Sequence, residues 1–205
     1  MKENQSLKYR TENFIRSKYY YENSLVYVNL MNIRDGDKLS KFEADITGQR
    51  LIELMYQPIK GRFGKAHLLN IHKHIFKDIY PFAGKLRQED ICKDQTMFCK
   101  SEFIVENLER TFKMLKSEKY LSEIPIKEFS VRLAVYMSEL NIIHPFREGN
   151  GRTIREFIRC LALKNKYYID WSLVNKEELL EAMISSVNKN HENLNECMFR
   201  VIKNK

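Results

Sequence analysis

The chain has 205 residues, of which 43% are hydrophobic and 30% are charged. This length and balance predict a single folded domain with a well-buried core, and they exclude a largely disordered chain. No apolar run approaches the ~18 residues of a transmembrane helix, and residues 1–10 lack the apolar core of a signal peptide. We therefore expect a protein that is made in the cytoplasm and has no membrane partner.

Basic residues outnumber acidic residues by 35 to 27, so the formal net charge is +8. Such a charge is compatible with binding to nucleic acid. The lysines, however, are spread along helical segments, and no aromatic RNA-binding pattern or basic stripe accompanies them. We retain a basic nucleic-acid or protein-binding module only as the non-enzyme alternative.

The four cysteines form no Cys-x-x-Cys pair, which favours reduced thiols. The histidines have no metal-binding spacing, which argues against a zinc site.

Two parts of unequal size are expected along the chain. Residues 1–35 are predicted to form an arm packed on the domain, with a short helix or an extended piece, and residues 36–205 to form one globular unit. Ser40 and Glu43 have the spacing of a capping box. This spacing predicts a helix over residues 40–56, with Ile52 and Met55 available for the core.

Helical periodicity resumes at residues 65–78, where His72 is predicted to lie at the edge of the core. Residues 87–100 break this periodicity, and residues 93–95 are a candidate turn, so we expect a small β-hairpin. Further helices are expected from Ser101, over residues 127–143, from Gly151 to Lys164, and over residues 175–185 and 191–203. The predicted fold class is therefore mainly α, with one small β-hairpin.

Residues 144–155, with the sequence HPFREGNGRTIR, hold the densest group of reactive side chains in the chain. Pro145 disfavours helical geometry at His144, and Gly149 and Gly151 allow a sharp turn, so one helix ends here and another begins. The second helix starts with unpaired backbone N–H groups that point into the loop, and such a helix end attracts anions. Phosphate is the expected ligand.

Four side chains of this segment suit the chemistry of a phosphate compound. Arg152 and Arg155 lie one helical turn apart, and their planar guanidinium groups match phosphate. Glu148 would be repelled by phosphate unless a divalent cation lay between them, and Mg²⁺ binds one or two carboxylates together with phosphates. His144 is a candidate general base, because imidazole titrates near neutral pH. The simpler alternative is a glycine-rich turn with a solvated arginine face and a packed histidine.

The same segment resembles the signature of the Fic family, His-x-Phe-x-(Asp/Glu)-Gly-Asn-Gly-Arg-x-x-Arg, at every defined position. Most Fic enzymes transfer AMP from ATP to a protein side chain. The resemblance therefore implies a helical Fic domain that acts as a protein adenylyltransferase, uses ATP and Mg²⁺, and modifies a Tyr, Ser or Thr hydroxyl of a target protein or of itself. A kinase or another phosphate-group transferase with the Fic fold is the alternative within the enzymes.

The resemblance also implies a role for each motif residue. His144 would deprotonate the target hydroxyl, Glu148 would hold Mg²⁺, and Phe146 would anchor the loop. The α- and β-phosphates would lie against Gly149, Asn150 and Gly151, and the β- and γ-phosphates would be oriented by Arg152 and Arg155.

Residues 72–76 (HKHIF) and 80–87 (YPFAGKLR) resemble the Fic domain upstream of its motif. In that family the hairpin at residues 87–100 would be a flap over the active site, and the target protein would add to it as an extra strand. Lys93 and Phe98 resemble the positions that clamp the target. An ordinary surface hairpin is the alternative.

Many Fic proteins carry an inhibitory helix with the pattern (Ser/Thr)-x-x-x-Glu-(Gly/Asn), but no Glu-Asn pair of this chain has Ser or Thr at the upstream position. The near matches are Glu12, Glu22, Glu106 and Glu192. We therefore expect a separate small antitoxin as the inhibitor, with Glu22 or Glu192 as the internal alternative. Residues 19–33 resemble the start of Fic domains in the antitoxin-inhibited subset, which includes secreted bacterial effectors. An open Arg155 and an active isolated chain follow from this expectation.

Overall fold

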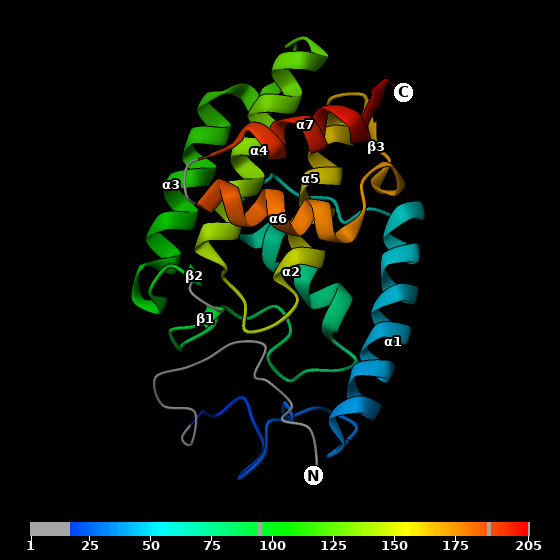
Figure 1. The fold of residues 1–205 in the computed structure, drawn as a ribbon, viewed down its shortest axis with the longest axis vertical. Helices are drawn as coiled ribbons and strands as arrows, with labels where there is room; N and C mark the ends of the chain where they lie inside the picture. Colours follow the sequence, from blue (N-terminus) through cyan, green and yellow to red (C-terminus); the bar gives the residue numbers. More distant parts are fainter. Residues whose placement is uncertain (1–16, 94–95, 188–189, 205) are drawn as a thin grey trace.

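Seven α-helices make up most of the computed structural model, which describes residues 17–93, 96–187 and 190–204 (Figure 1). Their bounds are α1 (Gly36–Tyr56), α2 (Lys65–Phe76), α3 (Ile104–Ser117), α4 (Ile126–Ile143), α5 (Asn150–Lys164), α6 (Lys176–Val187) and α7 (Glu192–Val201). Short 3₁₀ turns lie at Ser101–Phe103, Lys119–Leu121 and Trp171–Leu173. The prediction of a mainly α fold is confirmed, and no helix in the described ranges is both long and apolar enough to cross a bilayer.

The strands are short and lie in two antiparallel pairs. β1 (Cys92–Lys93) pairs with β2 (Thr96–Met97), which confirms the predicted hairpin, although residues 94–95 of its candidate turn lie outside the described residues. β3 (Tyr167–Ile169) pairs with β4 (Ile202–Asn204). The expected helix over residues 191–203 was wrong at its end, because residue 202 becomes extended and the chain pairs with a segment that is rich in aromatic and β-branched residues.

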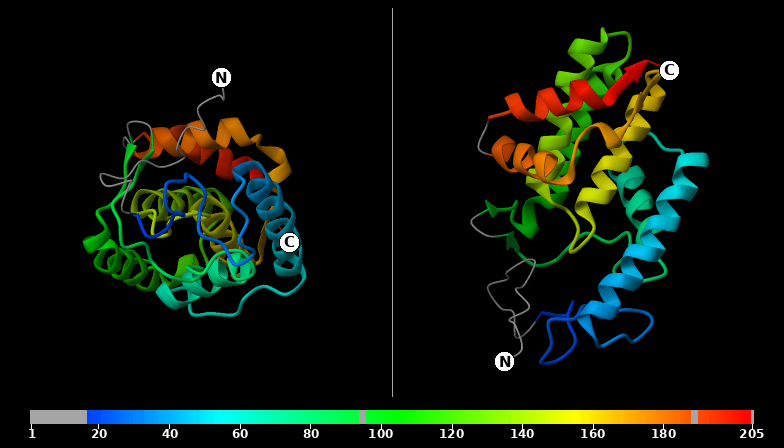
Figure 2. Two further views of the ribbon diagram at one scale, coloured as in Figure 1. Left: turned by 90° about the horizontal axis from the view of Figure 1, so that it is seen from below. Right: turned by 45° about the vertical axis from the view of Figure 1, so that its right-hand side comes forward.

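Helices α4 and α5 form the centre of the molecule. α4 contacts α3, α5, α6 and α7, and α5 also contacts α2. The view from below in Figure 2 shows these two helices surrounded by the others. The side chains of Phe129, Leu133, Phe157 and Leu161 are fully buried between these layers. The loop that joins α4 to α5 is therefore supported from several sides, and this loop carries the HPFREGNGR sequence.

Helix α1 begins earlier than predicted. Asp35 is its N-cap, and its side chain accepts a hydrogen bond of 2.9 Å from the backbone N–H of Lys38. The predicted capping box at Ser40 was wrong, because that residue already lies inside the helix. Glu43, its supposed partner, instead contacts an arginine of α5. The sequence pattern therefore identified the helix correctly but not the residue that caps it.

The buried stripe of α1 also differs from the predicted one. Leu39, Thr47 and Leu54 are buried, whereas Ile52 and Met55 are 56% and 67% exposed. The buried positions recur at seven- or eight-residue intervals, and a helix turns by about 100° per residue, so Ile52 lies on the opposite face from Leu54. α1 thus packs against α2 through a narrow stripe that includes a threonine.

The described part of the N-terminal arm, residues 17–35, lies against the underside of the domain (Figure 1). Tyr20 and Tyr27 form an antiparallel bridge, and their rings stack with centroids 4.7 Å apart. The N–H of Leu30 donates to the carbonyl of Ile79 at 2.8 Å, which ties the arm to the segment that follows α2. Residues 1–16 of the expected arm lie outside the described residues.

Candidate active site

The loop between α4 and α5 is closed by its own side chains. His144 ends α4 in the left-handed conformation, with φ of 46°, and its N–H donates to the carbonyl of Leu140 at 3.0 Å. The Asn150 amide bonds to both backbone groups of Phe146: its oxygen accepts at 2.9 Å and its nitrogen donates at 2.7 Å. The side chain of Asn150 therefore fixes the loop, a role that the sequence alone did not indicate.

His72 of α2 supports this loop from below. Its Nδ1 accepts the N–H of Gly84 at 2.7 Å, so its Nε2 carries the proton and donates to the carbonyl of Glu148 at 3.0 Å. The ring stacks on Phe146 with centroids 3.8 Å apart. His72 is fully buried and not at the edge of the core, and burial lowers its pKa to about 4. The neutral imidazole thus joins α2, the loop and the segment before the hairpin.

The depressed pKa of His72 predicts a loss of stability in mild acid. In the unfolded chain this group takes up a proton below about pH 6.5, whereas in the folded chain it does so only near pH 4, so the free energy of unfolding falls as the pH falls between these values. The expected loss is about 2 kcal/mol between pH 7 and pH 5. Urea unfolding at both pH values measures this loss.

His72→Gln should lose most of this pH dependence, whereas His74→Gln should retain it. Equal pH dependence in all three proteins would contradict the assignment of the titration to His72.

Gly149 occupies a position that no other residue fits. Its φ is 79°, in the left-handed region, and a Cβ built on it would lie 2.1 Å from Cζ of Phe76. The N–H of Gly149 donates to Oε1 of Glu148 at 2.9 Å, and its carbonyl accepts from the backbone and hydroxyl of Thr153. Gly149 thus packs directly against the fully buried ring of Phe76.

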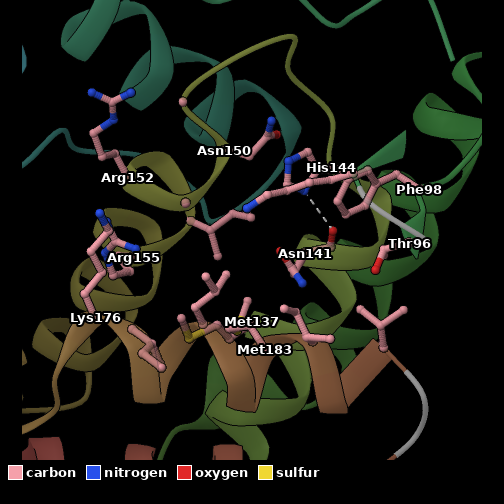
Figure 3. Close-up of a pocket in the computed structure, with 18 of the residues that line it drawn as sticks. Thr96, Phe98, Met137, Asn141, His144, Asn150, Arg152, Arg155, Lys176 and Met183 are labelled. Atoms are coloured by element: carbon pink, nitrogen blue, oxygen red, sulfur yellow. Dashed lines mark hydrogen bonds between the residues drawn. The ribbon is translucent and has the colours of Figure 1, made fainter. Parts of the chain in front are cut away.

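The His144 ring is held between the loop and the segment that follows the hairpin. Its Nδ1 donates to the carbonyl of Asn141 at 3.1 Å, which leaves the lone pair of the neutral imidazole on Nε2 (Figure 3). The ring of Phe98 stacks on it with centroids 3.8 Å apart. A base in this tautomer can accept a proton through Nε2 while Nδ1 keeps the ring oriented.

Arg87 joins the hairpin to the loop, and sequence reasoning did not assign it a role. Its Nε donates to the carbonyl of His144 at 2.8 Å, and its backbone N–H donates to the carbonyl of Pro145 at 2.9 Å. Its Nη2 also donates to the carbonyl of Cys99, which follows β2. Burial lowers the pKa of Arg87 to about 10, which still leaves it charged at neutral pH. The YPFAGKLR segment, which ends at Arg87, was the sequence feature that could have indicated this structural role.

Arg147 faces the N-terminal arm. Its side chain is fully buried, and its Nη2 and Nη1 donate to the hydroxyls of Tyr20 and Tyr27 at 2.7 Å and 3.1 Å. The guanidinium carbon lies 5.0 Å and 5.2 Å from the centroids of the same two rings. Nothing in the local pattern identified these partners, which precede Arg147 by more than a hundred residues.

The two arginines at the start of α5 have different surroundings. Arg152 donates to Glu43 at 2.6 Å and to Thr47 at 3.0 Å, both on α1. Burial lowers the pKa of Arg152, but the carboxylates of Glu43 and Glu148 more than offset this and raise it. Arg155 has neither a hydrogen bond nor an ion pair within residues 17–93, 96–187 and 190–204, and burial followed by the charge of Arg152 lowers its pKa. Of the two arginines, Arg155 is therefore the one that a ligand can engage more readily.

These groups surround one cavity of about 790 Å³. In Figure 3, His144 and Phe98 lie on one side, Arg152 and Arg155 on the other, and α6 with Met183 runs below them. All the predicted site residues line this cavity except Phe146, which is buried beneath it: His144, Glu148, Gly149, Asn150, Gly151, Arg152 and Arg155 from the loop and α5, and Lys93 and Phe98 from the hairpin. The volume is that of a site for a small organic ligand, with one cationic end and one apolar wall.

The residues of the cavity fit a magnesium ion that arrives with a phosphate ligand. Glu148 lines the cavity with a carboxylate that is otherwise buried. The described segments contain no group of three or more His, Cys, Asp or Glu side chains that could hold an ion by themselves. Because Mg²⁺ typically binds one or two carboxylates and completes its shell with phosphates and water, a single glutamate suits it.

Several known proteins are similar to this chain in sequence and in fold. The Fic/DOC family model matches residues 62–162. Protein adenylyltransferase VbhT of Bartonella schoenbuchensis is 42% identical over 161 residues, which are 78% of this chain but only 34% of VbhT, so the chain spans about a third of that protein. The Fic protein of Escherichia coli (strain K12) is 33% identical over 79% of this chain and 80% of its own length.

A solved structure agrees with the sequence relatives. The N-terminal Fic domain of a VirB-translocated effector protein from Bartonella quintana, crystallised with bound ADP, superimposes with a TM-score of 0.85. The two are 26% identical, and the match covers 91% of this chain and 95% of that domain. Sequence, fold and the geometry of residues 144–155 lead to the same conclusion: this chain belongs to the Fic/DOC family.

Proposed function

We propose that this chain is a protein adenylyltransferase, which transfers AMP from ATP to a hydroxyl group of a protein side chain. The observation that carries the proposal is the arrangement of one cavity, in which an oriented imidazole faces the positive start of α5 and its two arginines. Relatives named protein adenylyltransferase, at 42% identity in VbhT and 28% in the protein of Bartonella henselae, support it. So does the ADP bound to the similar domain from Bartonella quintana.

The chemistry follows from the positions of these groups. Nε2 of His144 accepts the proton of a Tyr, Ser or Thr hydroxyl, and the oxygen forms a bond to the α-phosphorus of ATP. The bond from that phosphorus to the oxygen that bridges it to the β-phosphate breaks, and pyrophosphate leaves. The backbone N–H groups at the start of α5 and the guanidinium groups of Arg152 and Arg155 stabilise the negative charge on the phosphates. Glu148 would hold Mg²⁺, which when bound neutralises part of that charge.

The target protein is proposed to bind along the hairpin. β1 and β2 form a two-stranded sheet. Lys93 of β1 and Phe98, which directly follows β2, line the cavity, and Met97 is 63% exposed. An extended target segment can pair with an edge of this sheet through backbone hydrogen bonds, which demand little of its sequence. Because Phe98 also stacks on His144, the segment would place its hydroxyl close to the base.

The test of this function is the fate of each phosphate of ATP. The purified chain is incubated with candidate target protein, Mg²⁺ and ATP that is labelled either at the α-phosphate or at the γ-phosphate. We expect protein-bound label only from the α-phosphate. Transfer of the γ-phosphate would identify the chain as a kinase with a Fic fold and would overturn the proposal.

We also propose that inhibition comes from a separate small antitoxin. Arg155 has no carboxylate partner in the described ranges, and Glu22 and Glu192, the internal near matches, are exposed. The isolated chain is therefore expected to be active in the labelling experiment, and Glu22→Gly and Glu192→Gly are expected to leave its rate unchanged. A large gain of activity in either variant would show self-inhibition.

The likeness to a VirB-translocated effector supports secretion from the bacterial cytoplasm as the route to a target.

A further inference from the structure

An acidic residue of α1 lies against the first arginine of α5. Oε1 of Glu43 is 2.6 Å from Nη2 of Arg152, and both side chains are largely buried, at 15% and 20% exposure. The other carboxylate oxygen of Glu43 accepts a hydrogen bond from the hydroxyl of Tyr80. Glu43 is therefore fixed on one side by a phenol and on the other by the guanidinium, and the pair is not an exposed surface contact.

Thr47, one helical turn further along α1, completes this contact. Its hydroxyl donates to the carbonyl of Glu43 at 2.8 Å and accepts from Nη1 of Arg152 at 3.0 Å. α1 thus presents two acceptors to the two terminal nitrogens of one guanidinium, which is the geometry that this planar group favours. The ring of Phe76, with its centroid 4.7 Å from the guanidinium carbon, adds a further contact.

Arg152 has a competing partner in the loop that precedes its helix. Oε1 of Glu148 lies 3.4 Å from the same Nη2 atom, in an i,i+4 arrangement. If Glu43 were neutral, Arg152 would face Glu148 as its only close carboxylate, and the 3.4 Å contact would be expected to tighten. Such a pair would engage both the guanidinium that meets the phosphates and the carboxylate that would hold the metal.

We propose that Glu43, assisted by Thr47, is a positioning residue for Arg152: it holds the guanidinium on α1, where its contact with Glu148 stays at 3.4 Å, and so orients it toward a nucleotide diphosphate. The inference rests on the proposed function only in that the cavity binds adenine nucleotides. It assigns to α1, which lies outside the family motif, a part in phosphate recognition.

The experiment compares the binding of ADP and AMP by isothermal titration calorimetry in the presence of Mg²⁺. Arg152 is assigned to the β-phosphate, which AMP lacks. Glu43→Gln is therefore expected to weaken ADP binding by about tenfold, an ordinary effect for a residue that orients a binding group, and to leave AMP binding unchanged. Thr47→Val should cause a smaller loss in the same direction. Glu53→Gln, which changes an exposed carboxylate of the same helix that pairs with Arg50 at 2.8 Å, is the matched control and should bind both nucleotides normally.

A double-mutant cycle separates positioning from a general structural effect. In the Arg152→Ala background, Glu43→Gln should no longer change the affinity for ADP, because the group that Glu43 positions is absent. Equal weakening in both backgrounds, or equal weakening of ADP and AMP, would reduce Glu43 to a structural residue and overturn the inference. Tighter ADP binding by Glu43→Gln would overturn it as well, because Glu43 would then compete with phosphate for Arg152. Failure of the unaltered chain to bind any adenine nucleotide would instead overturn the proposed function.

Discussion

His144→Ala is expected to lower the rate of AMP transfer by about 10² to 10⁴-fold, the usual contribution of a general base, and to leave the affinity for ATP nearly unchanged. The imidazole is held by the carbonyl of Asn141 and by the ring of Phe98 at one side of the cavity, whereas the arginines lie at the other. The nucleotide is therefore bound mainly by groups that the substitution does not touch.

Initial rates with α-labelled ATP, and binding of ATP measured separately by calorimetry, test this expectation. His74→Ala is the matched control: its ring contacts Glu53 on the surface at 3.1 Å and has no place in the cavity. Its rate should equal that of the unaltered chain. Undiminished transfer by His144→Ala would refute the assignment of the base, and a parallel loss of ATP affinity would give the ring a role in binding instead.

Gly149→Ala is expected to remove activity and to lower the free energy of unfolding by about 2–5 kcal/mol. Two independent costs combine. An L side chain at a φ of 79° is strained. Its Cβ would also lie 2.1 Å from Cζ of Phe76, which is far closer than van der Waals contact. Phe76 is fully buried and carries Gly149 on one face, so it cannot withdraw without disturbing α2.

The control for this substitution is another glycine of the same chain. Gly48 lies inside α1, and a Cβ added there would meet nothing within 4 Å. Gly48→Ala should therefore retain full activity and gain up to about 1 kcal/mol from the higher helix propensity of alanine. Denaturant unfolding and rates of AMP transfer measure both variants. Unaltered stability of Gly149→Ala would mean that the loop does not rest on Phe76.

The site residues that could be predicted from the sequence are those whose roles depend only on neighbouring positions in the chain. The segment at residues 144–155 combines helix-ending and helix-starting signals with base, acid and arginines, and all of these act within one loop and one helical turn. The residues that support it could not be found in this way. Glu43 contacts Arg152 across 109 positions, and His72 contacts the Glu148 carbonyl across 76. A single sequence contains no periodic signal for pairs so far apart.

Two errors in the fold have the same origin. The spacing of Ser40 and Glu43 satisfied the pattern of a capping box, but Asp35 offered an earlier cap and tertiary contacts gave Glu43 another partner. The final segment, with Ile202, had a helical pattern until its pairing with β3 made it a strand. At Ile202 the helical propensity was overruled by a strand distant in sequence, and at Glu43 an equally distant arginine took the side chain that the capping box required.

The two tyrosine hydroxyls that bind Arg147 indicate where the stable domain begins. The guanidinium that donates to them belongs to the same loop as the imidazole, three residues after it, and is fully buried. A chain trimmed at residue 35 would strip two acceptors from a buried cation, which is among the costlier losses a fold can suffer. The minimal stable unit therefore starts before Tyr20, although that tyrosine stands more than forty residues ahead of the family match.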